Sequence, residues 1–221
     1  DFNFVAAPTH VSAETVFGSK HSTIIQNVKE VTNFLSATDA RSRIDYKVYI
    51  NKNNHLKITN KYGDVVLPSM AGNVTVDLSN GNLQTRELSG SSILNLAFGA
   101  AKIKSIQQGQ VAINFVDFTC EQGAKLTLDA KSSQVTIGQC DQLKLSSRRD
   151  QVSVGNVRSV TVESYFSKLK LLYVADAADL KLTYGELSTL GLGKSFKKCL
   201  ILSQMCDVGL VLETPMPYNA M

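Results

Sequence analysis

The chain has 221 residues, of which 43% are hydrophobic and 19% are charged, and its formal net charge is +4. This positive charge is small and evenly spread, so it does not by itself indicate nucleic-acid binding, and no apolar run is long enough to cross a membrane as a helix. The composition is ordinary for a soluble globular protein, with one large all-β domain or two small domains.

Residues 1–55 lack the pattern of the rest of the chain, and we expect them to form an irregular N-terminal cap. The segment 43–50, RIDYKVYI, alternates apolar and polar residues and predicts a strand that leads into the repeated region. The segment 23–35 is ambiguous, because its apolar spacing suits a helix whereas its β-branched residues favour a strand. The chain begins at Asp1 and not at methionine, which allows for a removed export signal without showing one.

A repeat of 17–18 residues follows the cap. Its eight reference positions, called anchors here, are Gly63, Gly81, Gly99, Val116, Ser133, Asp150, Ser167 and Gly185. The positions five before and two after each anchor are apolar in all eight units, whereas the position after the anchor is almost always polar. Side chains on a strand alternate between its two faces, so the contrast predicts strands with one buried and one wet face.

The alternation within each unit predicts strands, and therefore an all-β protein. The repeat of the units predicts that they stack, because one unit cannot bury its own apolar face but stacked units can. We expect a single-stranded parallel β-solenoid, a right-handed β-helix with eight or nine coils of 17–18 residues. The expected organisation is one domain: residues 1–55 as cap and leading strand, 56–213 as solenoid and 214–221 as C-terminal tail. After Gly185 the period stretches, and 197–213 reads as a last coil displaced by about three residues.

Each anchor is expected to mark a sharp corner, since glycine tolerates positive φ there. Serine and aspartate are small or turn-prone replacements, and Val116 is the exception. The residues just before the anchors form a row with five aromatic members: Tyr62, Asn80, Phe98, Phe115, Ser132, Arg149, Phe166 and Tyr184. Strict alternation predicts that this row faces inward, where aromatic rings pack on each other. The alternative is an aromatic ladder that binds sugar rings. Tyr165, outside this row, is better placed to face the solvent.

The cysteines are expected to be ordinary core residues. Cys120 and Cys140 fall on two different apolar rows, which favours buried thiols, with a disulfide or a metal site as alternatives. No zinc-type spacing such as C-x-x-C occurs, and all three histidines lie within residues 1–55. The sequence therefore predicts neither a metal site nor a cofactor.

The candidate binding residues are Tyr165, Arg148, Arg149, Lys168 and Lys170. Lys168 and Lys170, with Arg86, Lys102 and Lys104, lie on an outer face, and Arg148 and Arg149 lie at a corner. These basic residues could form a stripe for an acidic glycan or a phosphate-bearing surface. The alternative is a mixed, solvated surface, because acidic residues such as Asp117 and Glu186 share the same face.

Catalysis is not expected. The chain has no Ser/His/Asp set, no phosphate-binding loop and none of the long loops or clustered carboxylates that β-helix polysaccharide lyases and hydrolases carry. We therefore predict a protein that is not an enzyme, and keep a polysaccharide-active β-helix enzyme as the third alternative.

Two stretches carry a family resemblance. The first is IDYKVYINKNNHLKITNKYGDVVLPSMAGNVTVDLSNGNLQTREL (44–88), and the second is LKLSSRRDQVSVGNVRSVTVES (143–164), followed by SYFSKLKLL and TYGELSTL. With the NKYGDV corner, they resemble the adhesin family of cell-envelope β-solenoids in Bacteroides-type bacteria, over about residues 44–213. The resemblance implies a signal peptide, export to the cell envelope or the extracellular space, and no catalytic residues.

The expected function follows from the repeat and from the resemblance together. We expect a non-enzymatic adhesin whose rigid surface binds a host or cell-surface protein or glycan, with no nucleic-acid partner and no transmembrane segment. The alternative is a structural scaffold of the envelope that polymerises end to end.

Overall fold

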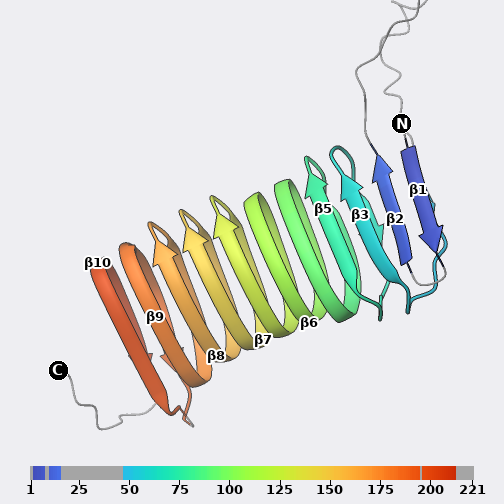
Figure 1. Ribbon diagram of the computed structural model, residues 1–221. Helices are drawn as coiled ribbons and strands as arrows, with labels where there is room; N and C mark the ends of the chain where they lie inside the picture. The colour runs from blue at the N-terminus through green and yellow to red at the C-terminus, as the bar shows by residue number, and fades with distance from the viewer. Residues whose placement is uncertain (1, 8–9, 16–46, 195, 213–221) are drawn as a thin grey trace, which may run out of the picture.

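The computed structural model describes residues 2–7, 10–15, 47–194 and 196–212, and in these residues it is an all-β parallel solenoid of about nine coils without a helix. Figure 1 shows the coils stacked along one axis from β1 at one end to β10 at the other. The strands are β1 (Phe2–Ala7), β2 (His10–Thr15), β3 (His55–Asn60), β4 (Val65–Leu67), β5 (Val74–Ser79), β6 (Leu83–Lys131), β7 (Gln134–Arg148), β8 (Gln151–Tyr165), β9 (Lys168–Leu192) and β10 (Lys198–Leu212). The predicted fold class is confirmed, and no helix in the described part of the chain could cross a membrane.

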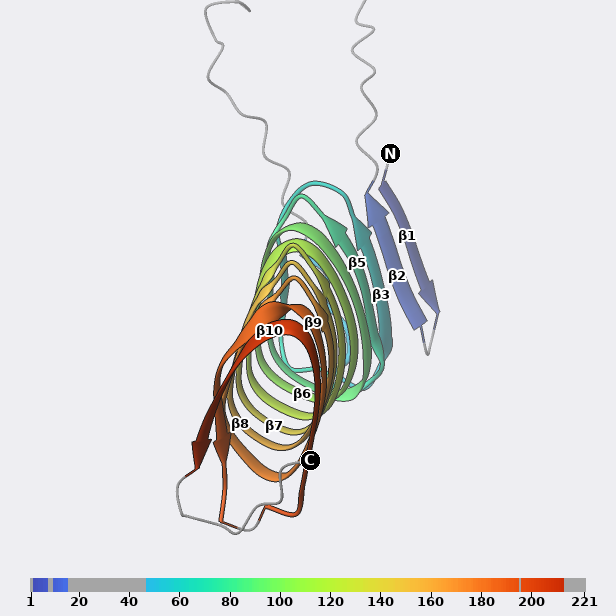
Figure 2. The ribbon, with the colours of Figure 1, turned by 90° about the vertical axis from the view of Figure 1, so that its left-hand side faces the viewer.

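Equivalent residues of successive coils lie beside one another, as the repeat predicts. β3 pairs with β5, and β5 with β6, at a constant offset that places Val76 next to Leu94. Further along, Leu128 pairs with Leu145. Figure 2, which looks along the stack, shows these coils enclosing a common interior.

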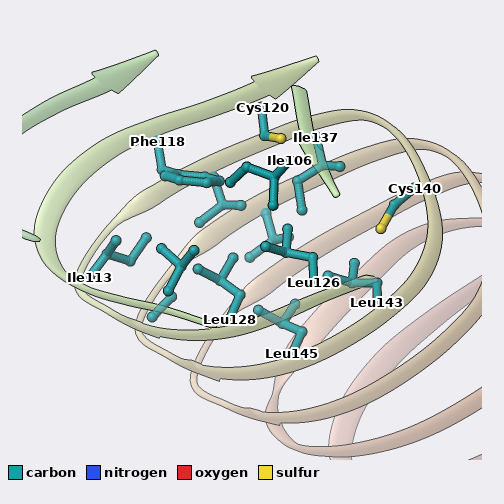
Figure 3. Close-up of a cluster of buried hydrophobic side chains, with 14 of the residues drawn as sticks. Ile106, Ile113, Phe118, Cys120, Leu126, Leu128, Ile137, Cys140, Leu143 and Leu145 are labelled. Atoms are coloured by element: carbon teal, nitrogen blue, oxygen red, sulfur yellow. The ribbon is translucent and has the colours of Figure 1, made fainter. Parts of the chain in front are cut away.

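The apolar rows fill that interior. Val76, Leu94 and Leu128 are each at most 1% exposed, and the buried aliphatic residues form one continuous cluster. Figure 3 shows Ile113, Leu128 and Leu145 pointing into the space that the coils surround. Burying a side chain of this size contributes about 1.5–3 kcal/mol, so the stacked rows are the main source of stability.

The strands are longer than the two short strands per unit that the pattern suggests. β6 alone covers 49 residues. β7 and β8 have 15 residues each, which is nearly a whole coil. Each bend keeps its backbone hydrogen bonds to the neighbouring coils, so the strand continues around it. β6, β7 and β8 end at the anchor corners before Ser133, Asp150 and Ser167, whereas β6 also continues through the corners at Gly99 and Val116, and β9 through that at Gly185.

The two ends differ from the regular coils. At the N-terminal end β1 and β2 form an antiparallel pair, and β2 runs parallel to β3, so this part of the cap is more regular than expected. Residues 47–50 are not a strand, and Tyr49 is 83% exposed, so the strand predicted over 43–50 is wrong where it is described. The segments 23–35 and 214–221 lie outside the described residues.

The last coil is displaced as predicted. β10 pairs with β9 in parallel, and Ile201 lies beside Leu180, an offset three residues greater than the usual spacing. Cys206 therefore occupies the anchor position next to Gly185.

Candidate functional site

One corner of every regular coil contains a residue with left-handed backbone geometry. These residues are Asn80, Phe98, Phe115, Ser132, Arg149, Phe166, Tyr184 and Met205, with φ between 50° and 61°. We call this set the corner row. It is the row just before the anchors without Tyr62 and with Met205 added, so the prediction that the anchors carry positive φ is wrong except at Gly63 (φ 123°).

The corner row faces the solvent. Phe98, Phe115 and Phe166 are 52–58% exposed, and Tyr184 is 43% exposed, so the predicted inward direction is also wrong. The left-handed residue interrupts the alternation of the strand, so that two successive residues point outward and the anchor then points inward. This explains Val116, which broke the expected corner rule: its side chain is 3% exposed and belongs to the core.

Glycine at the anchors serves close packing between coils and not positive φ. A Cβ added at Gly81 would lie 2.0 Å from the carbonyl oxygen of Gly63, and one at Gly99 would lie 2.0 Å from that of Gly81. Real Cβ atoms do not approach this closely, so these two coils can stack only without a side chain at the anchor.

The polar anchors of the central coils form a buried hydrogen-bond ladder. The backbone N–H of Val116 donates to Ser133 Oγ (3.1 Å), and that of Ser133 donates to Asp150 Oδ1 (2.7 Å). The N–H of Asp150 in turn donates to Ser167 Oγ (3.1 Å). Each anchor side chain therefore satisfies a buried N–H of the preceding coil, which fixes the backbone behind the corner row.

Asp150 is the charged member of this ladder and is 2% exposed. Its Oδ2 also accepts hydrogen bonds from Ser147 Oγ and from the N–H of Arg148, both at 2.7 Å. Burial raises the pKa of this carboxyl group, and the hydrogen bonds offset part of the increase. With its oxygens turned inward and bonded to protein donors, Asp150 supports the corner and does not meet a ligand.

Aromatic rings of the corner row stack in two pairs. The ring centroids of Phe98 and Phe115 lie 5.3 Å apart with an interplanar angle of 8°, and those of Phe166 and Tyr184 lie 5.0 Å apart at 7°. These separations match the spacing of about 4.8 Å between neighbouring strands. The pairs thus form two segments of one ladder on the outside of the solenoid.

Ser132 and Arg149 separate the two stacked pairs. Ser132 is short and half-buried, whereas Arg149 is exposed, and in the described structure no ring lies against the second face of Phe115 or of Phe166. The corner row therefore has a gap at Ser132, with a phenyl face on one side and a guanidinium-bearing residue on the other.

The predicted binding residues lie around this gap. Arg148 pairs in register with both Lys131 and Tyr165, so these three side chains form the row directly beside the corner row. Within the described residues the side chains of Arg148 and Arg149 form no ion pair, so both guanidinium groups are available to a ligand. Tyr165 is half-buried and donates a hydrogen bond from its hydroxyl to Glu163 Oε1 (3.2 Å).

The two predicted lysines lie beyond the other side of the corner. Lys168 and Lys170 follow the anchor Ser167 on β9 and line a shallow hollow of about 210 Å³ together with Gln151. Lys168 forms an exposed ion pair with Glu186 (3.4 Å). The structure thus brings all five predicted residues to adjacent outer rows of neighbouring coils.

A second surface, which the sequence reasoning missed, is a groove of about 530 Å³ on another side of the coils. Its walls include a register-matched series of polar side chains: Gln122, Gln139, Asn156 and Tyr173. The neighbouring row contributes an exposed ion pair between Arg158 and Asp141 (3.4 Å). The only signal for this groove in the sequence was the recurrence of amides at a spacing of 17 residues.

The cysteines behave as core residues where the prediction placed them inward. Cys120 and Cys140 are buried free thiols, and each donates a weak hydrogen bond to the carbonyl oxygen two residues ahead (3.4 and 3.3 Å). Burial raises the pKa of Cys120 to about 12 and that of Cys140 to about 11. Figure 3 shows both inside the solenoid among aliphatic side chains. Cys199 is exposed, contrary to expectation.

The candidate surfaces offer groups for contact and hydrogen bonding. In the ranges that the structure describes, no group of three His, Cys, Asp or Glu side chains could hold a metal ion. The exposed aromatic rings can stack on a ligand, the guanidinium groups can donate hydrogen bonds, and the amides can both donate and accept them.

Comparison of the chain with protein-family models, with curated proteins and with solved structures finds no match. The β-solenoid fold is therefore established by the structure alone, and membership of the adhesin family stays a prediction from the residues.

Proposed function

We propose that this protein is a non-enzymatic, exported protein of the cell envelope that uses the corner row of a rigid solenoid to bind a protein or a glycan. The observation that carries the proposal is the exposure of four aromatic rings at left-handed positions, namely Phe98, Phe115, Phe166 and Tyr184.

Folding alone does not account for these aromatic residues. A left-handed conformation costs a residue with a Cβ roughly 1–2 kcal/mol, and asparagine, which occupies the same position at Asn80, tolerates it best after glycine. Stacking stabilises each pair by about 0.5–1.5 kcal/mol. This is less than the conformational cost of the two left-handed residues in the pair, and it does not compensate for the exposure of their apolar surface. The sequence breaks two local preferences at four of the eight corner positions, which supports selection for contact with a partner.

The solenoid makes such a surface rigid. The corner residues are held by backbone hydrogen bonds between coils, such as that from the N–H of Ser132 to the carbonyl of Arg148 (2.9 Å) and that from Arg149 to Tyr165 (3.0 Å). A ligand that spans several coils would thus meet preordered side chains, which lowers the entropic cost of binding.

A binding screen tests this function. The full chain is applied to an array of glycans and of extracellular-matrix proteins, and we expect saturable binding to a subset of them. Protease shaving of intact cells that express the protein tests its location, because a surface protein is cleaved while cytoplasmic markers stay intact. Absence of binding across the array, together with complete protection from the protease, would contradict the proposal.

A second candidate function, an envelope scaffold that polymerises end to end, is favoured by the last coil. On β10 the outward side chain Leu202 is 56% exposed, and Leu210, on an inner row, is 54% exposed. β10 pairs with no further strand in the part of the chain that the structure describes, and an apolar strand edge of this kind invites pairing with another chain. Sedimentation velocity distinguishes the two functions, since a scaffold gives concentration-dependent oligomers and an adhesin of this design sediments as one small species.

A further inference from the structure

The interruption of the corner row at Ser132 is the starting point. The row continues above and below this coil with stacked rings, and the coil itself has the same left-handed geometry as its neighbours (φ 51°). A ring placed at the level of Ser132 would lie between Phe115 and Arg149, which are two coil spacings or about 9.6 Å apart. That distance accommodates one flat group stacked on the phenyl face and covered by the guanidinium group.

One side of the gap is basic. Lys131 lies there in the same coil as Ser132, and Arg148 lies beside it in the next coil. On the other side of the anchor Asp117 pairs in register with Gln134, and Lys168 lies two coils from Ser132 in an ion pair with Glu186. The ion pair of Lys131 with Asp129 is long (3.9 Å) and exposed, and the two arginines form none in the described structure. The gap therefore favours an anionic occupant.

The width of the apolar surface selects the kind of partner. The exposed rings form a strip one side chain wide, with charged and polar residues such as Arg148 and Gln151 on either side. A stable protein interface buries about 1,200–2,000 Å² around an apolar centre, which a strip of this width does not offer. A sugar ring needs only one aromatic face for its C–H groups, with polar neighbours for its hydroxyl groups.

We infer that the gap at Ser132 binds one acidic sugar residue, a uronate or a sulfated hexose of a polysaccharide, stacked on Phe115 with its anionic group on Arg149 and Arg148. The inference rests on the proposed function and specifies its ligand class and its place on the corner row. The glycan chain would cross the corner, because the ring lies parallel to the coils.

The test fills the gap and compares it with a matched control. Ser132→Phe completes the ladder and removes the space, whereas Asn80→Phe adds the same ring at an equivalent left-handed position (φ 56°) and leaves the gap open. Isothermal titration calorimetry uses the full chain with a galacturonate oligosaccharide, and with its methyl-esterified, neutral form as the control ligand.

We expect the wild type to bind the acidic oligosaccharide at least about tenfold more tightly than the neutral one, since each lost stacking or ionic contact of 1.4 kcal/mol is a factor of ten. Ser132→Phe should weaken binding by about tenfold or more, and Asn80→Phe should leave it unchanged. Arg149→Gln, a surface change that does not depend on packing a new ring, should also weaken binding by about tenfold and reduce its salt dependence.

Other outcomes overturn the inference. Equal affinity for the two oligosaccharides would show that the site does not select an acidic sugar. Unchanged binding by both Ser132→Phe and Arg149→Gln would show that the gap is not the binding site. A screen in which the wild type binds only proteins also overturns the inference but leaves the proposed function intact, so the two can fail separately.

Discussion

Replacement of Asp150 by alanine is expected to destabilise the solenoid at the corner by about 2–4 kcal/mol. The carboxylate accepts hydrogen bonds from the N–H groups of Ser133 and Arg148 and from Ser147 Oγ, each at 2.7 Å. Alanine leaves two of these donors, both backbone N–H groups, without a partner, and an unsatisfied buried donor costs about 1–3 kcal/mol. Urea unfolding followed by circular dichroism measures the difference in the free energy of unfolding.

Asp150→Ser is the matched control, because serine already occupies the equivalent anchors. Ser133 Oγ and Ser167 Oγ each accept the N–H of the preceding anchor and donate to the carbonyl two residues before (2.9 and 3.0 Å). A serine at position 150 can accept the N–H of Ser133 but leaves that of Arg148 without its partner, so we expect a loss of about 1–2 kcal/mol, roughly half that of alanine. If alanine and serine destabilise the protein equally, the hydrogen-bond ladder is not the reason for the aspartate.

The pH dependence of stability, compared between the wild type and Asp150→Ser, tests the cause of the raised pKa of Asp150. The folded protein holds the proton more tightly than the unfolded chain, in which the pKa is near the ordinary 3.8. The contribution of this carboxyl group to stability is therefore fully present below that value and is lost as the pH rises through the raised, folded pKa. The stability of the wild type relative to Asp150→Ser should fall from pH 4 towards pH 7, and a rise over this range would refute desolvation as the dominant cause.

Three further changes test other parts of the structure. Thr85→Val should raise the free energy of unfolding by about 1 kcal/mol, because the buried Oγ1 of Thr85 has no hydrogen-bond partner among the described residues. A loss of stability measured by urea unfolding would show that the hydroxyl group is satisfied. Gly99→Ala should lower the melting temperature sharply, since its Cβ would lie 2.0 Å from the carbonyl oxygen of Gly81, and an unchanged melting curve would contradict the close stacking. Cys120 and Cys140 should resist alkylation at neutral pH until the protein unfolds, because their raised pKa values keep them as buried thiols, whereas the exposed Cys199 should be alkylated first in a mass-spectrometric time course.

The sequence predicts the fold well because the physical signal is repeated. Val76, Leu94 and Leu128 come from three units and occupy the same buried position, so an error at a single residue has little effect on the prediction. The displaced last coil was also readable, since the apolar pattern around Ile201 shifts as a block.

The corner could not be predicted in the same way. Strict alternation assigned Phe98 and Phe166 to the interior, and only the left-handed backbone turns them outward. Phenylalanine is an unusual residue at positive φ, so propensity pointed to the glycine one position later. The polar groove around Gln139 was missed because an amide on an outer row has no distinct signal by itself.

The most direct test of the account replaces the exposed aromatic residues by asparagine. Phe98, Phe115, Phe166 and Tyr184 are changed together to the residue that the chain already uses at position 80, and binding to the partners from the array is measured alongside the melting temperature. We predict a folded protein that melts at or near the wild-type temperature and has lost its binding. A folded variant that binds all its partners with wild-type affinity would show that the corner row is not the contact surface.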